Sequence, residues 1–227
     1  MRKSLQINNN RFIFLELWIT LERGGCSMSE HYYAKTPNVK SERKTISKQL
    51  RGQTLSFITD AGVFSKGSID FGSTLLVESF EMPDVQGSVL DIGCGYGPVG
   101  LTVASAYPER QVHMIDVNER AIALSAENAA ENHLHNVCIY ENKAFENVPS
   151  NEFALVLTNP PIRAGKDVVF SFYEQAYQKL VNGGSLWVVI QKKQGAPSSM
   201  KKMESLFGNV SVEAKQKGYY LLKSIKS

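Results

Sequence analysis

Val89-Leu90-Asp91-Ile92-Gly93-Cys94-Gly95-Tyr96-Gly97-Pro98 carries the clearest structural signal in the sequence, a short strand followed by a glycine-rich turn. Residues 88–92 form a short apolar run with one acid, which is typical of a buried parallel strand. Three glycines follow at alternate positions, and residues 99–107 have helical character. A strand, a glycine turn and a helix in this order bind nucleotide-like ligands at the carboxyl edge of an α/β sheet, because a Cβ atom there would hold the backbone away from the ligand.

The composition is that of an ordinary globular protein. The 227 residues suffice for one α/β domain with small additions, and 43% of them are hydrophobic. A net charge of +3 neither requires nor excludes a nucleic-acid partner. The three cysteines are scattered and form no CxxC pair, so we expect neither a bound metal nor a disulfide framework, and a cytoplasmic setting fits best. The oligomeric state is left open.

The first 27 residues differ from the rest of the chain. Their apolar stretch, residues 12–21, contains Glu16 and is too short and too charged for a membrane span, and no clean signal-peptide cleavage site follows it. Residues 22–25 (Glu-Arg-Gly-Gly) can be encoded by a purine-rich run shortly before Met28, as a translated bacterial ribosome-binding site would be. We therefore expect residues 1–27 to be a non-native or disordered leader, and no membrane partner.

Strands and helices alternate along the chain. Residues 28–87 are predicted to form an N-terminal arm, a β-hairpin (44–50 and 54–59) and a helix over 69–82 that Pro83 ends. In residues 88–227, further strands are predicted over 111–116, 137–140, 153–158, 185–190, 210–214 and 219–225, and helices over 119–132, 168–181 and 200–207. Asn118 is the expected cap of the helix 119–132, and Asn182-Gly183-Gly184 is the expected end of the helix 168–181. Residues 191–199 are predicted to form a polar loop. This order predicts an α/β, doubly wound, Rossmann-like and mostly parallel seven-stranded sheet with an N-terminal hairpin extension.

Two motifs point to different chemistries. Residues 95–100 read GxGxxG and Asp116 lies 21 residues after Gly95, a combination found in NAD-dependent oxidoreductases. Asp91 inside the strand and Asn159-Pro160-Pro161 after the strand 153–158 favour another reading. An oxidoreductase would leave Asn159 unexplained.

In order and on these strands, the motifs resemble those of class I S-adenosylmethionine-dependent methyltransferases. Asp91-Ile-Gly-Cys-Gly-Tyr-Gly matches their first motif, Asp116 their ribose-binding acid, and Asn159-Pro160-Pro161-Ile162 their Asn-Pro-Pro motif. Residues 63–76 and 159–166 are further similar to the small-subunit ribosomal RNA guanine-N2 methyltransferases, in particular their compact single-domain Gram-positive members. The resemblance runs from Tyr32 to the C-terminus. It implies S-adenosylmethionine as cofactor and, as substrate, an exocyclic amine of RNA, most specifically guanine N2 of 16S-type RNA or of the small subunit.

The chemistry accounts for these residue types. Asp116 at a strand end can accept hydrogen bonds from both ribose hydroxyls, and Asp91 can brace the amides of the glycine turn and reach the methionine amino group. The Asn159 side-chain oxygen and the Pro160 carbonyl can each accept one N–H of a ring-conjugated amine and present its lone pair to the methyl group. The expected catalytic residues are Asn159, Pro160, Pro161 and Ile162. In the resembled family the stretch 64–72 lines the cofactor pocket, and this resemblance implicates Phe64, Ser65, Asp70 and Gly72. With them, the expected cofactor site comprises Asp91, Gly93, Cys94, Gly95, Gly97, Asp116, Val117, Lys143, Ala144 and Asn159.

RNA contact is expected on basic segments. Better-known members of the resembled family have an aromatic residue where this chain has Ile162, so Arg163 or a tyrosine is the candidate for the missing base or phosphate contact. The basic residues predicted to contact RNA flank the pocket (Arg163, Lys166, Lys192 and Lys193) or lie in the N-terminal arm and hairpin (Lys35, Lys40, Arg43, Lys44, Lys48 and Arg51).

Alternatives stay open at this point. For Phe64 and Phe71, core packing is as good a reading as cofactor contact. An adenine-N6 or protein-glutamine methyltransferase shares Asn-Pro-Pro, although glutamine enzymes usually add an aromatic residue and a helical N-terminal domain. A non-catalytic RNA-binding paralogue would show decay of Asp91 or Asn159, and both are intact.

Overall fold

The computed structural model describes residues 39–141, 148 and 152–227. The chain divides into two units, residues 1–30 and 31–227, and all of the described residues belong to the second unit. The predicted leader (residues 1–27) and the predicted true start at Met28 lie outside the described residues and stay predictions. The same holds for the predicted contact residues Lys35, Lys143 and Ala144. Within the described ranges, no helix is long and apolar enough to cross a membrane.

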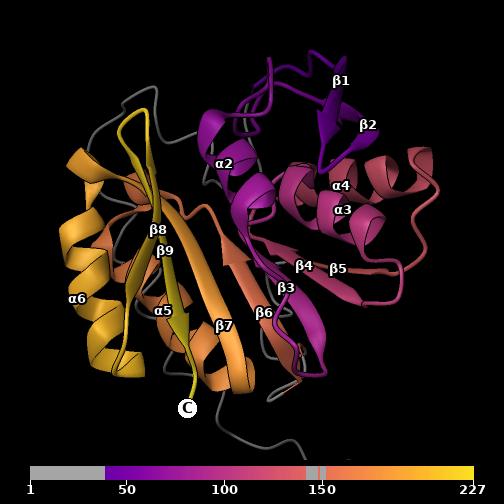
Figure 1. Cartoon of the computed structure of the whole chain (residues 1–227). Coiled ribbons are helices and arrows are strands. Elements are labelled where there is room, and N and C mark those ends of the chain that lie inside the picture. Colours follow the sequence, from indigo (N-terminus) through magenta and orange to yellow (C-terminus); the bar gives the residue numbers. More distant parts are fainter. Residues whose placement is uncertain (1–38, 142–147, 149–151) are drawn as a thin grey trace, which may run out of the picture. The chain divides into compact units, whose positions relative to one another are not determined.

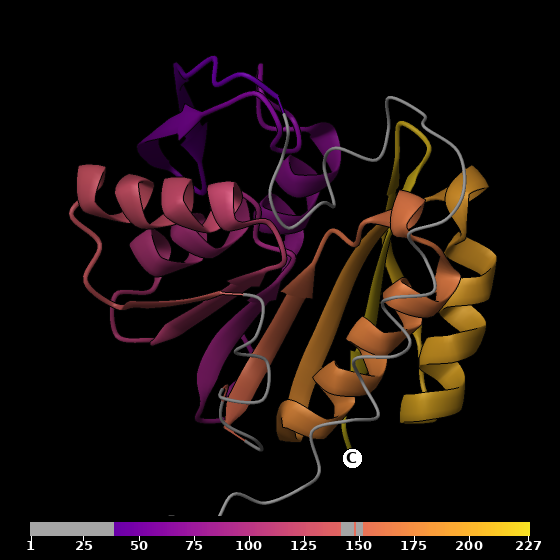
Figure 2. The same cartoon turned by 180° about the vertical axis from the view of Figure 1, so that it is seen from behind.

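A seven-stranded sheet in the order β5-β4-β3-β6-β7-β9-β8 forms the centre of the second unit (Figures 1 and 2). All neighbouring strands are parallel except β9, which runs antiparallel to both β7 and β8. The predicted doubly wound, mostly parallel sheet is therefore confirmed. The strands are β3 (Ser88–Ile92), β4 (Val112–Asp116), β5 (Val137–Glu141), β6 (Phe153–Thr158), β7 (Leu180–Gln191), β8 (Ser211–Gln216) and β9 (Tyr219–Ile225).

The chain winds from β3 outward to β5, returns to pair β6 with β3, and then winds the other way. The carboxyl ends of β3 and β6 therefore flank the point where the strand order reverses. Ligands of open α/β sheets bind in the crevice at such a point. The glycine turn follows β3 and Asn159 follows β6, so the topology brings both motifs to this crevice.

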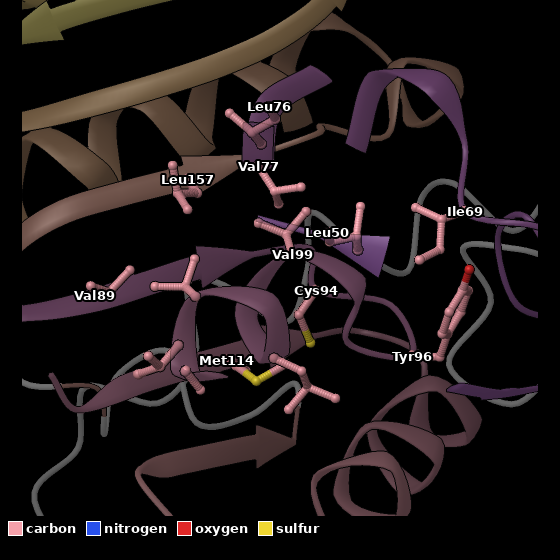
Figure 3. Close-up of a cluster of buried hydrophobic side chains, with 14 of the residues drawn as sticks. Leu50, Ile69, Leu76, Val77, Val89, Cys94, Tyr96, Val99, Met114 and Leu157 are labelled. Atoms are coloured by element: carbon pink, nitrogen blue, oxygen red, sulfur yellow. The ribbon is translucent and has the colours of Figure 1, made fainter. Parts of the chain in front are cut away.

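Alternating side chains of the strands divide the core between the two faces of the sheet. Leu155 and Leu157 of β6 belong to one buried cluster, whereas Phe153 and Val156 belong to the other. The first cluster includes side chains of α2 (Phe71–Ser79), α3 (Pro98–Ala106), α4 (Glu119–Glu131) and the hairpin β1 (Lys44–Leu50) and β2 (Gln53–Thr59); the second includes those of α5 (Lys166–Lys179) and α6 (Ala196–Phe207). Figure 3 shows the first cluster, in which Leu50, Leu76, Val99 and Leu157 come from four different elements.

The predicted hairpin is joined to α4 by two asparagine side chains. Asn128 accepts from the Ile58 amide (2.6 Å) and donates to the Ile58 carbonyl (3.0 Å). Asn132 does the same with the amide (2.9 Å) and carbonyl (2.6 Å) of Ser56. Each asparagine thus takes the place of a neighbouring strand along one edge of β2. A two-stranded hairpin is stable here because its free edge is covered and its inner face is buried.

Three predicted boundaries are wrong. The predicted helix 168–181 ends at Lys179, and β7 begins at Leu180, so Asn182-Gly183-Gly184 lies inside a strand instead of closing a helix. The Gly183 amide donates to the Lys226 carbonyl (2.7 Å) and the Lys226 amide to the Gly184 carbonyl (2.9 Å), so pairing with a distant segment overrides the local turn signal. The helix before Pro83 ends at Ser79, and α6 begins at Ala196 rather than Met200, with Pro197 in its first turn.

Candidate functional site

Three adjacent strand ends bring the main motif residues together. Ile92 of β3 pairs with Ile115 of β4 and with Thr158 of β6. The Thr158 hydroxyl also donates to the Ile92 carbonyl (2.8 Å), which ties β6 to β3 at this edge. The residues that follow these positions, Gly93, Asp116 and Asn159, therefore lie side by side at the carboxyl edge of the sheet.

Asp116 holds the glycine turn in place. One of its carboxylate oxygens accepts from the Gly95 amide (2.8 Å), and the other accepts from the Asn118 amide (2.8 Å). Asn118, as predicted, caps α4 by accepting from the Arg120 and Ala121 amides. Each carboxylate oxygen of Asp116 keeps a second acceptor position, so the half-buried Asp116 can still accept from a pair of vicinal hydroxyls.

The side chain of Asp91, a residue of β3, reaches the N-terminus of α3. It is only 1% exposed, and one of its oxygens accepts from the Gly100 amide (2.8 Å). Burial, with a smaller contribution from the Asp116 charge, raises the pKa of Asp91 to about 7. In dinucleotide-binding folds the pyrophosphate binds at this helix terminus, where amides and the helix dipole attract an anion. The Asp91 carboxylate at this position would repel a pyrophosphate, so the structure argues against a dinucleotide-dependent oxidoreductase.

The glycines of the turn serve two different purposes. A Cβ atom added to Gly95 would meet no atom within 4 Å, so this residue faces open space at the crevice, as a residue that lines a ligand site must. A Cβ atom added to Gly97 would lie 2.6 Å from Leu101 and 3.0 Å from the Ser125 hydroxyl. The structure gives Gly97 a packing role at the start of α3, and its predicted contact with the cofactor stays a prediction.

This difference predicts distinct effects of two alanine substitutions. Gly97→Ala adds a clash to a left-handed backbone (φ +103°), so we expect it to lower the free energy of unfolding by about 2–4 kcal/mol. Gly95→Ala (φ +58°) meets no atom, so we expect about 1 kcal/mol. Its methyl group would instead obstruct the crevice and weaken cofactor binding. Urea unfolding and calorimetric titration of both variants check this, and equal stability losses would contradict it.

Asn159 is held with its side chain in one orientation. Its Nδ2 group donates to the Asp70 carboxylate (3.1 Å) and to the Ser73 hydroxyl (3.0 Å). Both amide hydrogens are thereby used, and the side-chain oxygen faces away from these partners as a hydrogen-bond acceptor. The same Asp70 oxygen accepts from the Ser73 amide (3.1 Å) and caps α2. Ser73 escaped prediction, although an Asp-x-x-Ser helix start places both side chains on one helical face.

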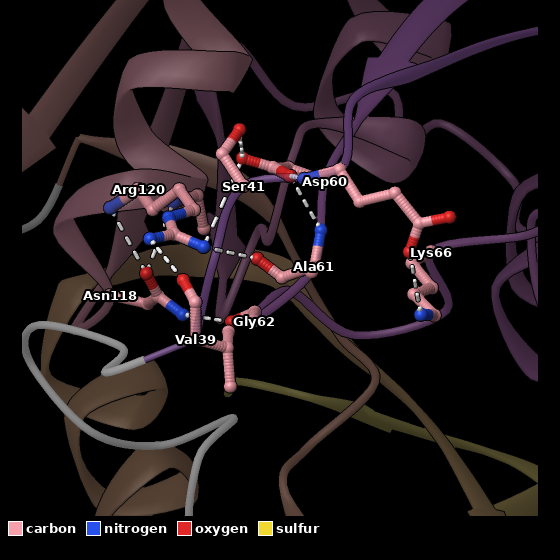
Figure 4. Close-up of polar contacts among 10 residues, drawn as sticks. Val39, Ser41, Asp60, Ala61, Gly62, Lys66, Asn118 and Arg120 are labelled. Carbon is pink, nitrogen blue, oxygen red and sulfur yellow. Dashed lines mark hydrogen bonds and ion pairs between the residues drawn. The ribbon is translucent and has the colours of Figure 1, made fainter.

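The loop between β2 and α2 is anchored beside Asp116. The Asn118 side chain donates to the Gly62 carbonyl (2.8 Å), and Arg120 donates to the carbonyls of Ala61 and Val39 (Figure 4). Asp60, at the start of the loop, is 3.9 Å from Arg120. These contacts connect three segments: the chain before β1, the start of the loop, and the N-terminus of α4. The cap of α4, Asn118, follows Asp116 and Val117 in the sequence, so the loop is held next to these two residues.

The predicted cofactor residues of this loop have different environments. Phe64 is 51% exposed, so core packing is excluded as its role. Phe71 is half-buried against Tyr219, with ring centroids 5.7 Å apart. The Ser65 hydroxyl donates to the Ser68 carbonyl and so stabilises the loop itself. Their contacts with a cofactor stay predictions.

Tyr96, in the middle of the glycine turn, was not predicted as a site residue. Its hydroxyl is buried and has no hydrogen-bond partner within the described part of the chain. Burial and the nearby Asp70 charge raise the pKa of this hydroxyl. Figure 3 shows it directed toward Ile69, the residue before Asp70. A buried hydroxyl without a partner beside the crevice is a group that a bound ligand can satisfy.

Basic residues predicted to contact RNA divide into two groups. Arg163, Lys166, Lys192 and Lys193 are exposed in the segments that follow β6 and β7, at the same edge as Asn159. Arg51, by contrast, is used by the fold. Its guanidinium donates to the carbonyls of Val77 (2.8 Å) and Phe80 (3.1 Å) at the end of α2, and its contact with RNA stays a prediction.

Arg43 and Lys44 form ion pairs with Glu127 and Glu42, and Lys48 is exposed on β1. Their contacts with RNA, like that of Lys40, stay predictions.

Comparison with known proteins agrees with this geometry. Residues 54–223 match the model of the methyltransferase small domain. The chain belongs to this family. Its cofactor is S-adenosylmethionine, which fits a glycine turn open at Gly95, an acid that can accept from ribose hydroxyls, and a helix terminus unsuited to phosphate.

Relatives of the chain include methyltransferases of ribosomal RNA. An uncharacterized Bacillus subtilis protein, YbxB, is 56% identical over 88% of this chain and 100% of its own length. The ribosomal RNA small subunit methyltransferase C of Vibrio cholerae is 30% identical over 84% of this chain and 56% of its own length.

A solved structure with the same fold is that of the T. thermophilus 16S rRNA N2 G1207 methyltransferase in complex with AdoMet and guanosine. It has a TM-score of 0.73 and 24% identity, and the match covers 84% of this chain and 52% of that one. The chain thus spans about half the length of these two RNA methyltransferases.

The pKa of Asp91 predicts a pH-dependent affinity for the cofactor. Partial burial of its carboxylate also raises the pKa of Asp116. Ionised carboxylates accept hydroxyl hydrogens and attract an ammonium group better than protonated ones do. We therefore expect affinity for S-adenosylmethionine to rise several-fold as the pH increases from about 6 to 8, through the Asp91 pKa. Calorimetric titration across this range measures it. Asp91→Asn is expected to flatten the profile, and a flat wild-type profile would contradict the prediction.

The raised pKa of Asp91 has the opposite effect on the free energy of unfolding of the protein without its cofactor, which decreases as the pH rises. A carboxyl whose folded-state pKa is raised from 3.8 to about 7 is destabilising once it ionises. The contribution of Asp91 to stability is therefore expected to fall as the pH rises through this interval, and to stay constant above it.

Proposed function

We propose that the protein transfers the methyl group of S-adenosylmethionine to an exocyclic amine of RNA, most specifically guanine N2 of small-subunit ribosomal RNA. The observation that carries the proposal is the oriented Asn159 side chain at the carboxyl ends of β3 and β6. Relatives named as ribosomal RNA methyltransferases support RNA as the substrate class. The predicted cytoplasmic location fits such a substrate.

Asn159 and Pro160 would act on the reacting amine. A ring-conjugated amine is planar and a poor nucleophile, because its lone pair is delocalised. The Asn159 oxygen and the Pro160 carbonyl would each accept one N–H, pull the nitrogen toward a pyramidal geometry and so present its lone pair to the methyl group. Bound S-adenosylmethionine supplies the activated methyl group. As the nitrogen gains positive charge, its N–H groups become stronger donors, so both acceptors bind the transition state more tightly than the ground state.

Asp70 would strengthen this effect through Asn159. Its carboxylate accepts an N–H from the amide, which increases the electron density on the amide oxygen. No strong general base is required, because the methylated aromatic ammonium is itself a strong acid. The chain's own contribution is therefore orientation and electrostatic stabilisation.

We propose guanine rather than another amine only because the sequence resembles guanine-N2 methyltransferases and because of the names of its relatives. Ile162 can pack against a base but cannot stack on it as an aromatic ring does. Adenine N6 and the amide nitrogen of a protein glutamine are also NH2 groups with a delocalised lone pair. The experiment must therefore distinguish these two substrates from guanine.

The experiment is mass mapping of ribosomal RNA from cells with and without the protein. We expect the loss of one N2-methylguanine from the small-subunit RNA, restored by the wild-type protein and not by Asn159→Ala. Tritiated methyl transfer to naked RNA and to purified small subunits identifies the form of the substrate. Loss of an N6-methyladenine instead would identify adenine as the target base. If no RNA modification is lost although the protein binds its cofactor, the substrate is a protein amine.

A further inference from the structure

Positive charge is concentrated at the C-terminal end of the sequence. Residues 192–227 contain eight lysines and two acidic residues, whereas residues 1–191 contain 17 basic and 20 acidic residues. The first part of the chain is therefore slightly acidic, and the net positive charge comes from the C-terminal segment. Such a segregation of charge favours a polyanionic partner on the surface that this segment forms.

Four of these lysines meet at the carboxyl edge of the sheet. Lys192 and Lys193 lie in the short helix η4 (Lys192–Gln194) after β7, and Lys215 and Lys217 lie at the turn between β8 and β9. The Lys192 amide donates to the Gly218 carbonyl (2.8 Å), so the two segments are in direct contact. We call these four lysines the lysine edge. All are exposed, and none forms an ion pair with another described residue.

The lysine edge adjoins the candidate catalytic site. The Lys217 ammonium lies 4.6 Å from the centre of the Phe71 ring, and Phe71 directly follows Asp70, which holds Asn159. Tyr219 packs against Phe71 and is fixed by a hydrogen bond from Gln191 (2.7 Å). A strand of nucleic acid with its target base at Asn159 would therefore pass its phosphates close to Lys217.

The backbone at Lys217 is unusual for a lysine. Lys217 and Gly218 have φ values of +47° and +80°, the pattern of a two-residue hairpin turn in which Asn-Gly is preferred. The β1–β2 hairpin has the same pattern at Arg51 and Gly52, with φ values of +46° and +76°. There the side chain of Arg51 compensates by donating to three groups of α2 and α3. Lys217 makes no hydrogen bond of this kind within the described residues, and its ammonium group instead lies over the Phe71 ring beside the candidate site.

We propose that the lysine edge binds the phosphate backbone of the substrate RNA next to the methylated nucleotide. This inference rests on the proposed function and adds the surface by which the RNA is held. Phosphates close to four unpaired ammonium groups release counterions on binding, and this gives affinity without sequence preference. The base pocket at Asn159 then determines which nucleotide reacts.

The test compares two double variants of the full chain, each of which removes two charges from one hairpin. Lys215→Gln with Lys217→Asn neutralises the β8–β9 turn, and Asn at position 217 suits the turn, so folding is preserved. Lys44→Gln with Lys48→Gln neutralises β1 and also tests the sequence-based prediction that this strand contacts RNA. The ligand is small-subunit ribosomal RNA from cells that lack the protein, and its Kd is measured by filter binding at several salt concentrations.

We expect the β8–β9 variant to bind RNA about tenfold more weakly at about 100 mM salt, and the slope of log Kd against log salt to fall by about 1.5. Affinity for S-adenosylmethionine and the thermal midpoint should stay unchanged. Equal RNA affinity and slope for this variant and the wild type would overturn the inference while leaving the function intact. A wild type that neither binds nor methylates RNA would overturn the proposed function and this inference with it.

Discussion

Replacing Asn159 by alanine is expected to lower kcat for methyl transfer about a thousandfold, with affinity for S-adenosylmethionine changed by no more than about threefold. In the proposed mechanism the amide oxygen accepts from the amine as it gains charge, and the two N–H groups of the amide are fixed by Asp70 and Ser73. Alanine removes the acceptor and leaves the strand ends that form the cofactor crevice unchanged. The loss should therefore appear in kcat rather than in cofactor binding.

Ile162→Ala is the matched control for this substitution. Ile162 starts the short helix η3 (Ile162–Ala164) in the same exit segment, and its truncation removes apolar contact without removing an acceptor. We expect the control to lose less than about tenfold in kcat. Single-turnover kinetics at saturating cofactor separates chemistry from product release. If Asn159→Ala keeps more than about a tenth of the wild-type rate, the amide is not the group that activates the amine.

The central part of the fold could be predicted because its signals are local. A buried parallel strand appears as a continuous apolar run, as in residues 153–158, and Gly93 to Gly97 mark the sharp turn after β3. The partnership of this turn with Asn159 could also be predicted. Strands that reverse their winding order between β3 and β6 must expose both ends at one crevice.

The errors arose where distant segments decide the structure. Asn182-Gly183-Gly184 has the composition of a helix end, yet backbone pairing with Lys226 makes it part of β7. The hydrogen bonds of Arg51 at the end of α2 likewise depend on how the hairpin packs, and the sequence alone does not show them. The lysine edge was missed in part because Lys215 and Lys217 approach η4 only through the β8–β9 turn. Charge and propensity in the sequence do not report such contacts.

Asp70 should act as a positioning residue for Asn159, and its removal is expected to lower kcat about 30- to 100-fold. Asp70→Ala removes the acceptor that orients the amide and the cap of α2, and the lost cap alone costs about 1 kcal/mol of stability. Asp70→Asn keeps an oxygen that can accept from Asn159 and cap the helix, but it removes the charge. We expect an intermediate loss of about tenfold, because the Asn159 oxygen is then less strongly polarised.

Ser73→Ala separates orientation of the amide from capping of the helix. The Ser73 backbone amide that Asp70 caps is kept, whereas the hydroxyl that accepts from Asn159 is lost. A fall in kcat of about three- to tenfold with an unchanged thermal midpoint would therefore show that the amide needs both acceptors.

The resemblance placed Asp70 among the cofactor-binding residues, and the same variants separate that role from positioning. If Asp70 contacts the cofactor, Asp70→Ala weakens cofactor binding in proportion to the loss of rate. If it positions Asn159, kcat falls while the Kd for S-adenosylmethionine stays constant, and Asp70→Ala adds little to Asn159→Ala in the double variant. An Asp70→Ala protein that folds and keeps its full kcat would show that the hydrogen bond from Asn159 to Asp70 does not contribute to catalysis.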